Sequence, residues 1–215
     1  MSDFAALAEF GCATVHEALG KKGVVDLDLV QVIPGSRAAG PARIARCGQD
    51  DNLMVHAAVA ALHPGEVLVV TMPRPAPIGL VGELLASQAK YRGAAAILVD
   101  AAVRDVEELR TLGLPVWARW IRVTGASKEI VGELDVAVKF GDERIAPGDA
   151  VVLDSDGAVV VPSGEIKQTI AAAAQRHAYE EEKKINYLSG TLSLDVLGLR
   201  GELESRGITV PGSTT

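Results

Sequence analysis

The spacing of apolar residues changes several times along the chain. Residues 3–20 repeat apolar positions at intervals of three, four and seven, which predicts a helix that stops near Gly20. Thr14 can cap a second, shorter helix within this stretch, so the pattern leaves open whether the helix is continuous. The next segment, 29–47, alternates only weakly, and short strands joined by turns are predicted there because it contains Pro34, Gly35, Gly40 and Pro41.

The middle of the chain alternates between helix and strand patterns. Residues 51–62 have helical spacing, and either Asp51 or Asn52 can cap this helix. Strand, helix, strand, helix and strand patterns then follow one another over 66–72, 82–92, 94–100, 105–112 and 114–120. This order is typical of crossover connections, and it predicts a mostly parallel sheet covered by helices.

The last third of the chain has a different character. Residues 136–140 and 150–162 are strand-like, and the Asp156-Gly157 pair within the second segment indicates a hairpin turn. A long helical pattern follows over 163–188, with the charge run EEEKK at 180–184.

These patterns predict an α/β fold with a second β layer and a C-terminal helical arm. We expect a single α/β catalytic domain over 1–162 and a helical arm over 163–215 that packs on a neighbouring subunit. No repeat or linker divides the chain further.

Composition narrows the range of partners. The 215 residues are 48% hydrophobic and only 4% aromatic, and the net charge is −7. An acidic chain without a basic block argues against nucleic acid and against an anionic membrane surface as partners. The widely separated Cys12 and Cys47 fit two small buried hydrophobic residues better than a disulfide. The N-terminus does not resemble a signal peptide and no stretch is long enough to span a membrane, so we expect a cytoplasmic protein.

The candidate chemistry lies after two predicted strands. A predicted helix begins near Gly82, and the amides of its first turn make an anion site without a basic residue; these amides belong to Gly82, Glu83, Leu84 and Leu85. Arg104 and Asp105 follow the strand over 94–100. Because ligands bind beyond the carboxyl ends of parallel strands, Glu83 and the Arg-Asp pair can converge at one rim.

The three side chains are chemically complementary. Arg104 offers two donors to a carboxylate, Asp105 is a typical single anchor for Mg²⁺, and Glu83 can hold a water as general base. Arg-Asp pairs are common at helix starts, so the residues alone favour Asp105 as a helix cap and Arg104 as a surface cation.

Over nearly its whole length the chain resembles the 4-hydroxy-4-methyl-2-oxoglutarate/4-carboxy-4-hydroxy-2-oxoadipate aldolases. These are divalent-metal pyruvate aldolases in the superfamily of the regulator of ribonuclease activity A. The segments that carry the resemblance are ATVHEALGKKG at 13–23, DNLMVHAAV at 51–59, LHPGEVLVV at 62–70, GELLASQAKYRG at 82–93, VDAAVRDVEEL at 99–109, LPVWARW at 114–120 and SLDVLGLRGEL at 193–203. The most specific element is an acidic residue, twenty intervening residues and then Arg-Asp, here Glu83 and Arg104-Asp105. Non-catalytic regulators of the superfamily typically lack the intact pair, so its presence favours a lyase.

The resemblance implies a layered β/β/α swivelling fold of the phosphohistidine-domain type, assembled as a homotrimer or homohexamer. It implies Mg²⁺ or Mn²⁺ on Asp105, the pyruvyl end of the substrate on Arg104 and on the amides of Gly82–Leu85, and a water positioned by Glu83. The implied reaction is retro-aldol cleavage of a 4-hydroxy-2-oxo acid to pyruvate in aromatic-acid degradation, with oxaloacetate decarboxylation beside it.

Other residues carry weaker implications of the same resemblance. Lys128 matches a lysine near the site, Asn52 matches an asparagine that faces the pocket, and Glu180 matches a glutamate contributed by a neighbouring subunit. A surface lysine, a helix cap and a register shift within EEEKK are the respective alternatives. No role is assigned to the histidines His16, His56, His63 and His177.

The chain also departs from the family pattern. Residues 77–81 and Ala102 differ from the residues typical of the aldolases, which leaves the distal group of the substrate open. The alternative function is a non-catalytic regulator of ribonuclease activity. A methyltransferase finds no support, because no glycine-rich nucleoside-binding turn follows an early strand.

Overall fold

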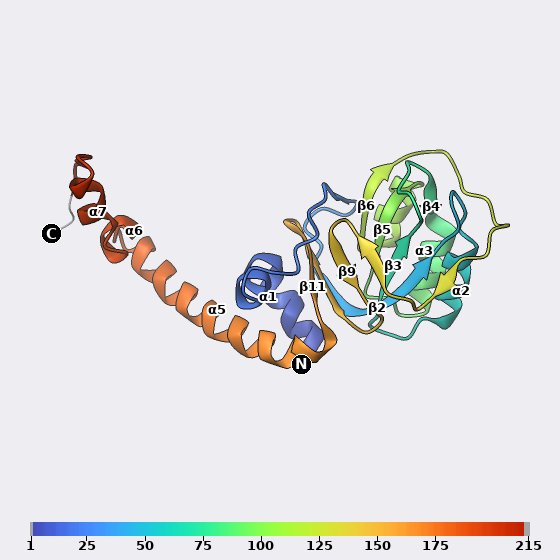
Figure 1. Cartoon of the computed structure of the whole chain (residues 1–215), viewed down its shortest axis with the longest axis horizontal. Helices are drawn as coiled ribbons and strands as arrows, with labels where there is room; N and C mark the ends of the chain where they lie inside the picture. Colours follow the sequence, from blue (N-terminus) through green and yellow to red (C-terminus); the bar gives the residue numbers. More distant parts are fainter. Residues whose placement is uncertain (1, 213–215) are drawn as a thin grey trace. The chain divides into compact units, whose positions relative to one another are not determined.

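The computed structural model describes residues 2–212 (Figure 1). Packing divides the chain into a first unit that ends at Ala173 and a second unit that begins at Ala174. The expected boundary at residue 162, and the packing of the arm on another subunit, stay predictions.

The first unit is built on one mixed sheet, ordered β1-β6-β5-β3-β2-β10-β11 within the described residues. β4 pairs with β5 in parallel and β7 pairs with β2, while β8 and β9 form a separate hairpin. The strands are β1 (Val30–Gln31), β2 (Ala38–Arg46), β3 (Val67–Thr71), β4 (Gly79–Val81), β5 (Ala96–Val103), β6 (Val116–Ile121), β7 (Glu133–Leu134), β8 (Val138–Phe140), β9 (Glu143–Ile145), β10 (Ala150–Asp154) and β11 (Gly157–Val161). The predicted parallel arrangement is confirmed for β3, β5 and β6, and β2 adds to it as a further parallel neighbour of β3. The predicted hairpin is confirmed for β10 and β11, where Asp154 pairs with Gly157.

Helices cover both outer faces of this unit. They are α1 (Asp3–Ala18), α2 (Leu53–Ala61), α3 (Glu83–Tyr91) and α4 (Val106–Leu112). Figure 1 shows α1 on the opposite side of the sheet from α2 and α3. The predicted first helix is not straight, because Gly11 has φ +78° inside it, and Thr14 lies within the helix rather than at a cap.

Three apolar cores follow from the alternation of side chains along the strands. Leu68 and Val70 of β3 face α2, α3 and α4 in one core, while Val67 and Val69 face Val151 and Leu153 of β10 in another. The opposite face of β10 and β11 packs against α1 in the third core. The sheet therefore curls so that β10 and β11 lie over β3 and β5.

The structure differs from the prediction at Gly40 and Pro41. Both lie inside β2 rather than in a turn, because β10 pairs with them there. A Cβ at Gly40 would collide with the carbonyl oxygen of Gly65, so glycine serves close packing at this position and not a reversal of the chain.

Cys12 and Cys47 are both buried and free, as the sequence predicts. Burial raises the pKa of the Cys47 thiol to about 12 and also raises that of Cys12. Both thiols therefore behave as small apolar side chains.

The helix predicted over 163–188 is a 3₁₀ turn (Ser163–Glu165) followed by α5 (Ile166–Leu188), which continues from the first unit into the second. The second unit also contains α6 (Ser193–Val196) and α7 (Leu199–Ser205). An ion pair between Arg200 Nε and Asp195 Oδ1, 2.5 Å apart, links these short helices. None of the helices in the described part of the chain has the length and apolarity that crossing a bilayer requires.

Candidate functional site

Two parallel strands end side by side and place the candidate residues. β4 leads into Gly82 and α3, and β5 leads into Arg104, Asp105 and α4. The amide of Arg104 donates to the carbonyl of Val81, 3.1 Å away, which fixes the two strand ends together. The predicted convergence is present, but the strand that precedes Gly82 is β4 and not the predicted strand over 66–72.

Asp105 has an unusual backbone conformation for a residue with a side chain. It lies in the left-handed region, with φ +59° and ψ +48°, at the start of α4. Its carboxylate makes no capping bond to α4 and turns instead toward α3, where Oδ2 accepts a hydrogen bond of 3.1 Å from the amide of Glu83. Oδ2 also lies 3.6 Å from Nε of Arg104.

Glycines surround the Arg104-Asp105 pair. A Cβ at Gly82 would collide with the Asp105 carboxylate, and one at Gly125 would lie 2.7 Å from Nη1 of Arg104. A Cβ at Gly79 would lie 3.5 Å from Cδ of Arg104. The Arg104 side chain therefore occupies space that only glycine leaves free at positions 82 and 125.

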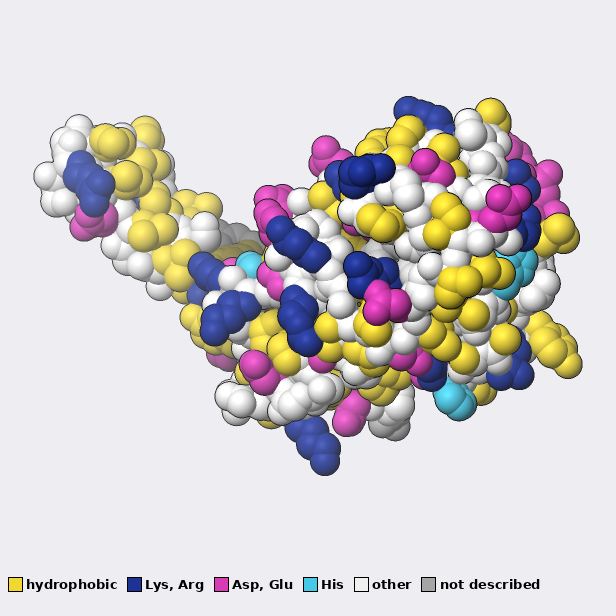
Figure 2. All heavy atoms as spheres, turned by 45° about the vertical axis from the view of Figure 1, so that its right-hand side comes forward, with side chains coloured by type: hydrophobic (Ala, Val, Ile, Leu, Met, Phe, Trp, Pro, Cys, Tyr) yellow, Lys and Arg dark blue, Asp and Glu magenta, His cyan; other side chains and the backbone are white. Residues whose placement is uncertain are grey.

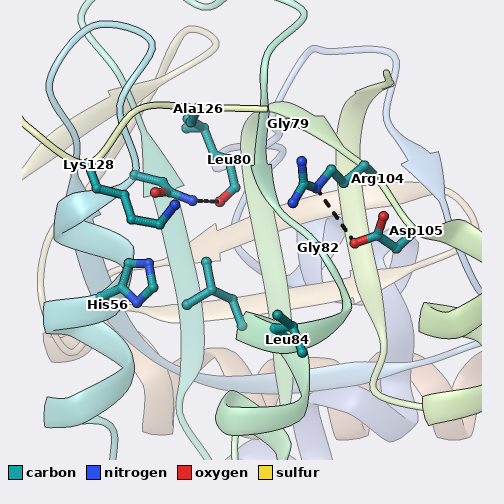
Figure 3. Close-up of a pocket in the computed structure, with 11 residues that line it drawn as sticks. His56, Gly79, Leu80, Gly82, Leu84, Arg104, Asp105, Ala126 and Lys128 are labelled. Atoms are coloured by element: carbon teal, nitrogen blue, oxygen red, sulfur yellow. Dashed lines mark hydrogen bonds and ion pairs between the residues drawn. The ribbon is translucent and has the colours of Figure 1, made fainter. Parts of the chain in front are cut away.

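The pair forms one side of a pocket of about 190 Å³ (Figure 3). Figure 3 shows Arg104 and Asp105 on one side of this pocket and His56 and Lys128 on the other. The pocket is lined by residues of four separate segments, namely Asn52, His56, Gly79, Leu80, Gly82, Leu84, Leu85, Arg104, Asp105, Ala126 and Lys128.

Asn52 is nearly fully buried at the start of α2. Its Nδ2 donates to the carbonyl of Leu80 at 2.9 Å, so the side chain ties α2 to β4 and does not cap its own helix. Its Oδ1 is buried and has no hydrogen-bond partner among the described residues, and the same holds for Nε2 of His56. The pocket thus contains two polar atoms that a ligand can satisfy.

Asp51 holds the loop that carries Lys128. This fully buried carboxylate accepts hydrogen bonds from the Ser127 hydroxyl at 2.6 Å and from the amides of Glu129 at 2.6 Å, Leu53 at 2.8 Å and Ile130 at 3.0 Å. Burial by itself disfavours the charged form, but these donors hold the pKa of Asp51 well below its ordinary value. Asp51 is therefore charged at neutral pH and fixes the loop against α2.

Most of the predicted site residues line this one pocket: Gly82, Leu84, Leu85, Arg104, Asp105, Asn52 and Lys128. Glu83 contributes its amide to Asp105, while its side chain is exposed and is not among the residues that line the pocket. Glu180 lies in the second unit, where its Oε1 pairs with Nε of Arg176 at 2.8 Å. The assigned roles of all these residues stay predictions.

The sequence pattern indicates Asp51 only as a possible helix cap and gives no role to His56. In the structure His56 lines the pocket, and Asp51 lies behind it and holds the loop that carries Lys128. His56 stands four residues after Asn52 on α2, so helical spacing from an already suspected residue was the available signal.

Asp105 is suited to a divalent metal held largely by water and substrate. Within the described residues no group of three or more His, Cys, Asp or Glu side chains could enclose a metal ion. A hard carboxylate oxygen in space cleared by Gly82 fits Mg²⁺, which keeps several waters and needs only one or two protein carboxylates.

Comparison with known proteins identifies the family of this chain. The sequence model of the RraA-like family, described as Aldolase/RraA, matches residues 12–160. A protein from Halalkalibacterium halodurans, provisionally named 4-hydroxy-4-methyl-2-oxoglutarate aldolase, is 29% identical over 168 residues, which are 78% of each chain.

Two solved structures are also similar. The RraAS2 protein of Streptomyces coelicolor, called an unusual member of the RNase ES inhibitor RraA family, is 30% identical with a TM-score of 0.76, covering 85% of this chain and 95% of that one. A Geobacillus kaustophilus protein called an S-adenosylmethionine:2-dimethylmenaquinone methyltransferase is 30% identical with a TM-score of 0.65, covering 70% and 93%. The family model spans more than half of the chain, and the chain therefore belongs to the Aldolase/RraA family.

Proposed function

We propose that this protein is a divalent-metal pyruvate aldolase. It cleaves 4-carboxy-4-hydroxy-2-oxoadipate, 4-hydroxy-4-methyl-2-oxoglutarate or both, and it decarboxylates oxaloacetate. The observation that carries the proposal is the contact of Arg104, Asp105 and the Glu83 amide at one end of a pocket whose other end is also polar. The layered β/β/α swivelling fold and the trimeric or hexameric assembly belong to the same proposal.

The chain's own groups bind and orient the substrate. The Arg104 guanidinium binds the pyruvyl end, and the first-turn amides of α3 take its carboxylate. As the C3–C4 bond breaks, its electrons pass to the pyruvyl group, and Arg104 stabilises the negative charge that develops on the 2-oxo oxygen. Glu83 positions the water that takes the proton from the C4 hydroxyl. Asp105 would hold Mg²⁺ or Mn²⁺, which supplies a Lewis acid when bound.

The test is pyruvate release from the two aldol substrates and from oxaloacetate, with Mg²⁺ and with a chelator. We expect turnover that the chelator abolishes. Asp105→Ala should abolish the metal-dependent turnover, whereas Asp142→Ala, which removes an exposed carboxylate in the β8–β9 hairpin, should not change it. Turnover that ignores the chelator, or a fully active Asp105→Ala protein, would contradict the proposal.

The second candidate is a regulator that binds a ribonuclease or helicase. It is supported by the name of the Streptomyces coelicolor relative, which is 30% identical. The Arg104-Asp105 contact argues against the regulator, because binding a ribonuclease or helicase does not require a metal-binding carboxylate beside an arginine. Specific co-purification of a ribonuclease with a protein inert toward all three substrates would favour the regulator.

A further inference from the structure

Strand β5 contains an irregularity just before it reaches the Arg104-Asp105 pair. The register between β5 and β6 shifts by one residue, so that Asp100 and Ala101 of β5 lie opposite Arg119 alone. The pairs on either side of the shift are Val99 with Ala118 and Ala102 with Trp120. Such a β-bulge bends a strand and changes the direction of the side chains that follow it.

The bulge also marks the point at which β5 changes its other neighbour. β3 pairs with β5 as far as Val99, whereas β4 pairs with it from Ala102 onward. The amides of Ala102 and Arg104 donate to the carbonyls of Ile78 and Val81, at 3.0 Å and 3.1 Å respectively. The end of β5 is thus held by the short strand that leads into α3, and no longer by β3.

A buried ion pair crosses the bulge. Nη1 of Arg119 donates to Oδ1 of Asp100 at 3.0 Å, and the two side chains are 26% and 4% exposed. The Arg119 guanidinium also lies over the ring of Trp120, 4.7 Å from its centroid, and Trp120 pairs with Ala102. The ion pair and the ring contact therefore connect Asp100, inside the bulge, with the residue opposite the first paired position after it.

This ion pair is better suited to fixing geometry than to adding stability. Burial raises the pKa of the Asp100 carboxyl, and the opposing effect of Arg119 does not restore the ordinary value. The desolvation cost of a buried ion pair often matches its Coulomb attraction, so apolar side chains can stabilise two strands as well. A hydrogen-bonded pair is directional, however, and it therefore fixes the position of one strand along the other.

We propose that Asp100 and Arg119 are positioning residues for the candidate site. Their contact holds the β5 bulge in place, and the bulge sets where Arg104 and Asp105 leave the strand. The Asp105 carboxylate is thereby kept 3.1 Å from the Glu83 amide and beside the Arg104 guanidinium. The effect on turnover rests on the proposed function, whereas the effect on the end of β5 does not.

Amide hydrogen exchange of the full chain tests the effect on β5 without any substrate. Asp100→Ala removes the acceptor and should speed the exchange of the Ala102 and Arg104 amides by about tenfold or more, because their bonds to the β4 side depend on the bulge. The amide of Ile97, which donates to Pro115 before the bulge, should change by less than about twofold.

Two variants control this comparison. Asp100→Asn keeps an oxygen that accepts from Arg119 and should return the exchange rates to within about threefold of the wild type. Asp149→Ala removes another buried carboxylate of the first unit, which accepts from the amides of Ala146 and Ser163. Any loss of stability in this variant should speed the exchange before and after the bulge alike.

Turnover with Mg²⁺ is the second measurement. Asp100→Ala should lower kcat for pyruvate release by about 10- to 100-fold, because the groups of the site are present but misplaced. Asp100→Asn should recover most of this loss. Asp149→Ala should keep the wild-type kcat when all variants are assayed below their melting temperatures.

The outcomes separate this inference from the proposed function. Equal acceleration at Ile97, Ala102 and Arg104 in Asp100→Ala, or no acceleration, would overturn the positioning role at any level of turnover. Selective acceleration after the bulge with an unchanged kcat would also overturn it. A wild type that turns over none of the three substrates would contradict the proposed function, and selective acceleration in Asp100→Ala would then still support the positioning role.

Discussion

Asp51 shows how one buried charge can determine the shape of a pocket that it does not line. Its four hydrogen-bond donors come from the start of α2 and from residues 127–130, which enter the pocket from different directions. These hydrogen bonds offset the free-energy cost of burying the charged carboxylate, because no cation is among its hydrogen-bond partners.

Replacing this carboxylate should cost stability in a pH-dependent way. Asp51→Asn keeps the size of the side chain but loses the charge, and we expect a loss of about 2 kcal/mol in the free energy of unfolding at pH 7. Because the folded-state pKa lies below the ordinary 3.8, this contribution is present above about pH 4 and is lost as the pH falls below it.

Urea unfolding of both proteins between pH 3 and pH 7 measures this difference. The difference between the two stabilities should shrink steadily as the pH falls from 4 toward 3. A difference that is independent of pH would show that the carboxylate acts through shape alone.

At the residue scale, some of the site could be predicted and some could not. Arg104 and Asp105 directly follow a strand pattern, so their place at the carboxyl edge of a parallel sheet is readable from the sequence. His56 and Asp51 could not be recognised, because a lone histidine on a helix and an acidic residue at a helix start are usual in any fold. Asp51 binds residues 127–130, and His56 lines a pocket with residues 79–85, and these segments are distant in sequence.

At the element scale, β4 is the strand that could not be predicted from the sequence. Pro73, Pro75 and Pro77 end the strand pattern after β3, and three residues are too few to produce a recognisable alternation. The segment nevertheless forms a strand, because Gly79 and Val81 pair with the last residues of β5. Tertiary pairing, and not local propensity, therefore places α3 beside Asp105.

Gly82→Ala tests this junction of β4 and α3. The glycine has φ −134° and ψ −170°, which alanine adopts without strain, so the substitution should leave the stability nearly unchanged. The added Cβ must displace the Asp105 carboxylate, and kcat/KM for pyruvate release should fall by roughly 100-fold.

Gly164→Ala is the matched control for this change. No atom lies within 4 Å of a Cβ added at Gly164, so this variant should keep wild-type activity and the wild-type melting temperature. A fully active Gly82→Ala protein would show that the Asp105 carboxylate does not have to lie where the structure places it.

At the scale of the whole molecule, net charge and local charge have opposite signs. The chain carries −7 overall, and Figure 2 shows Lys and Arg side chains interspersed with Asp and Glu on the face in view. The pocket instead gathers Arg104, Lys128 and the first-turn amides of α3 around a single carboxylate, Asp105. An acidic protein can therefore attract a small dicarboxylate, because binding depends on the local potential.

The exposed apolar side chains of α5 in the second unit provide a test of the expected oligomeric assembly. They include Ile185 at 68% and Leu188 at 81% of their full accessibility. If the arm packs on a neighbouring subunit, Leu188→Asp should weaken the association by about 30-fold or more, the effect expected from one lost buried leucine.

Light scattering of the full chain measures this effect. The wild type should scatter as a trimer or hexamer of 22.4 kDa subunits, and Leu188→Asp should dissociate on dilution. Tyr91→Asp, at a position in the first unit that is 91% exposed, is the control and should not change the mass. A wild type that is monomeric and fully active would contradict both the assembly and the proposed contribution of Glu180.

The left-handed backbone of Asp105 limits which substitutions this position accepts during evolution. Among residues with side chains, asparagine and aspartate accept φ near +59° most readily, and glycine accepts it freely. A single nucleotide change can turn an aspartate codon into one for asparagine or glycine. The most accessible substitutions at this position therefore remove the negative charge while they preserve the turn. If Asp105 anchors the proposed metal, one mutational step can remove the proposed catalysis and still leave a folded protein with its pocket, which could then serve in binding alone.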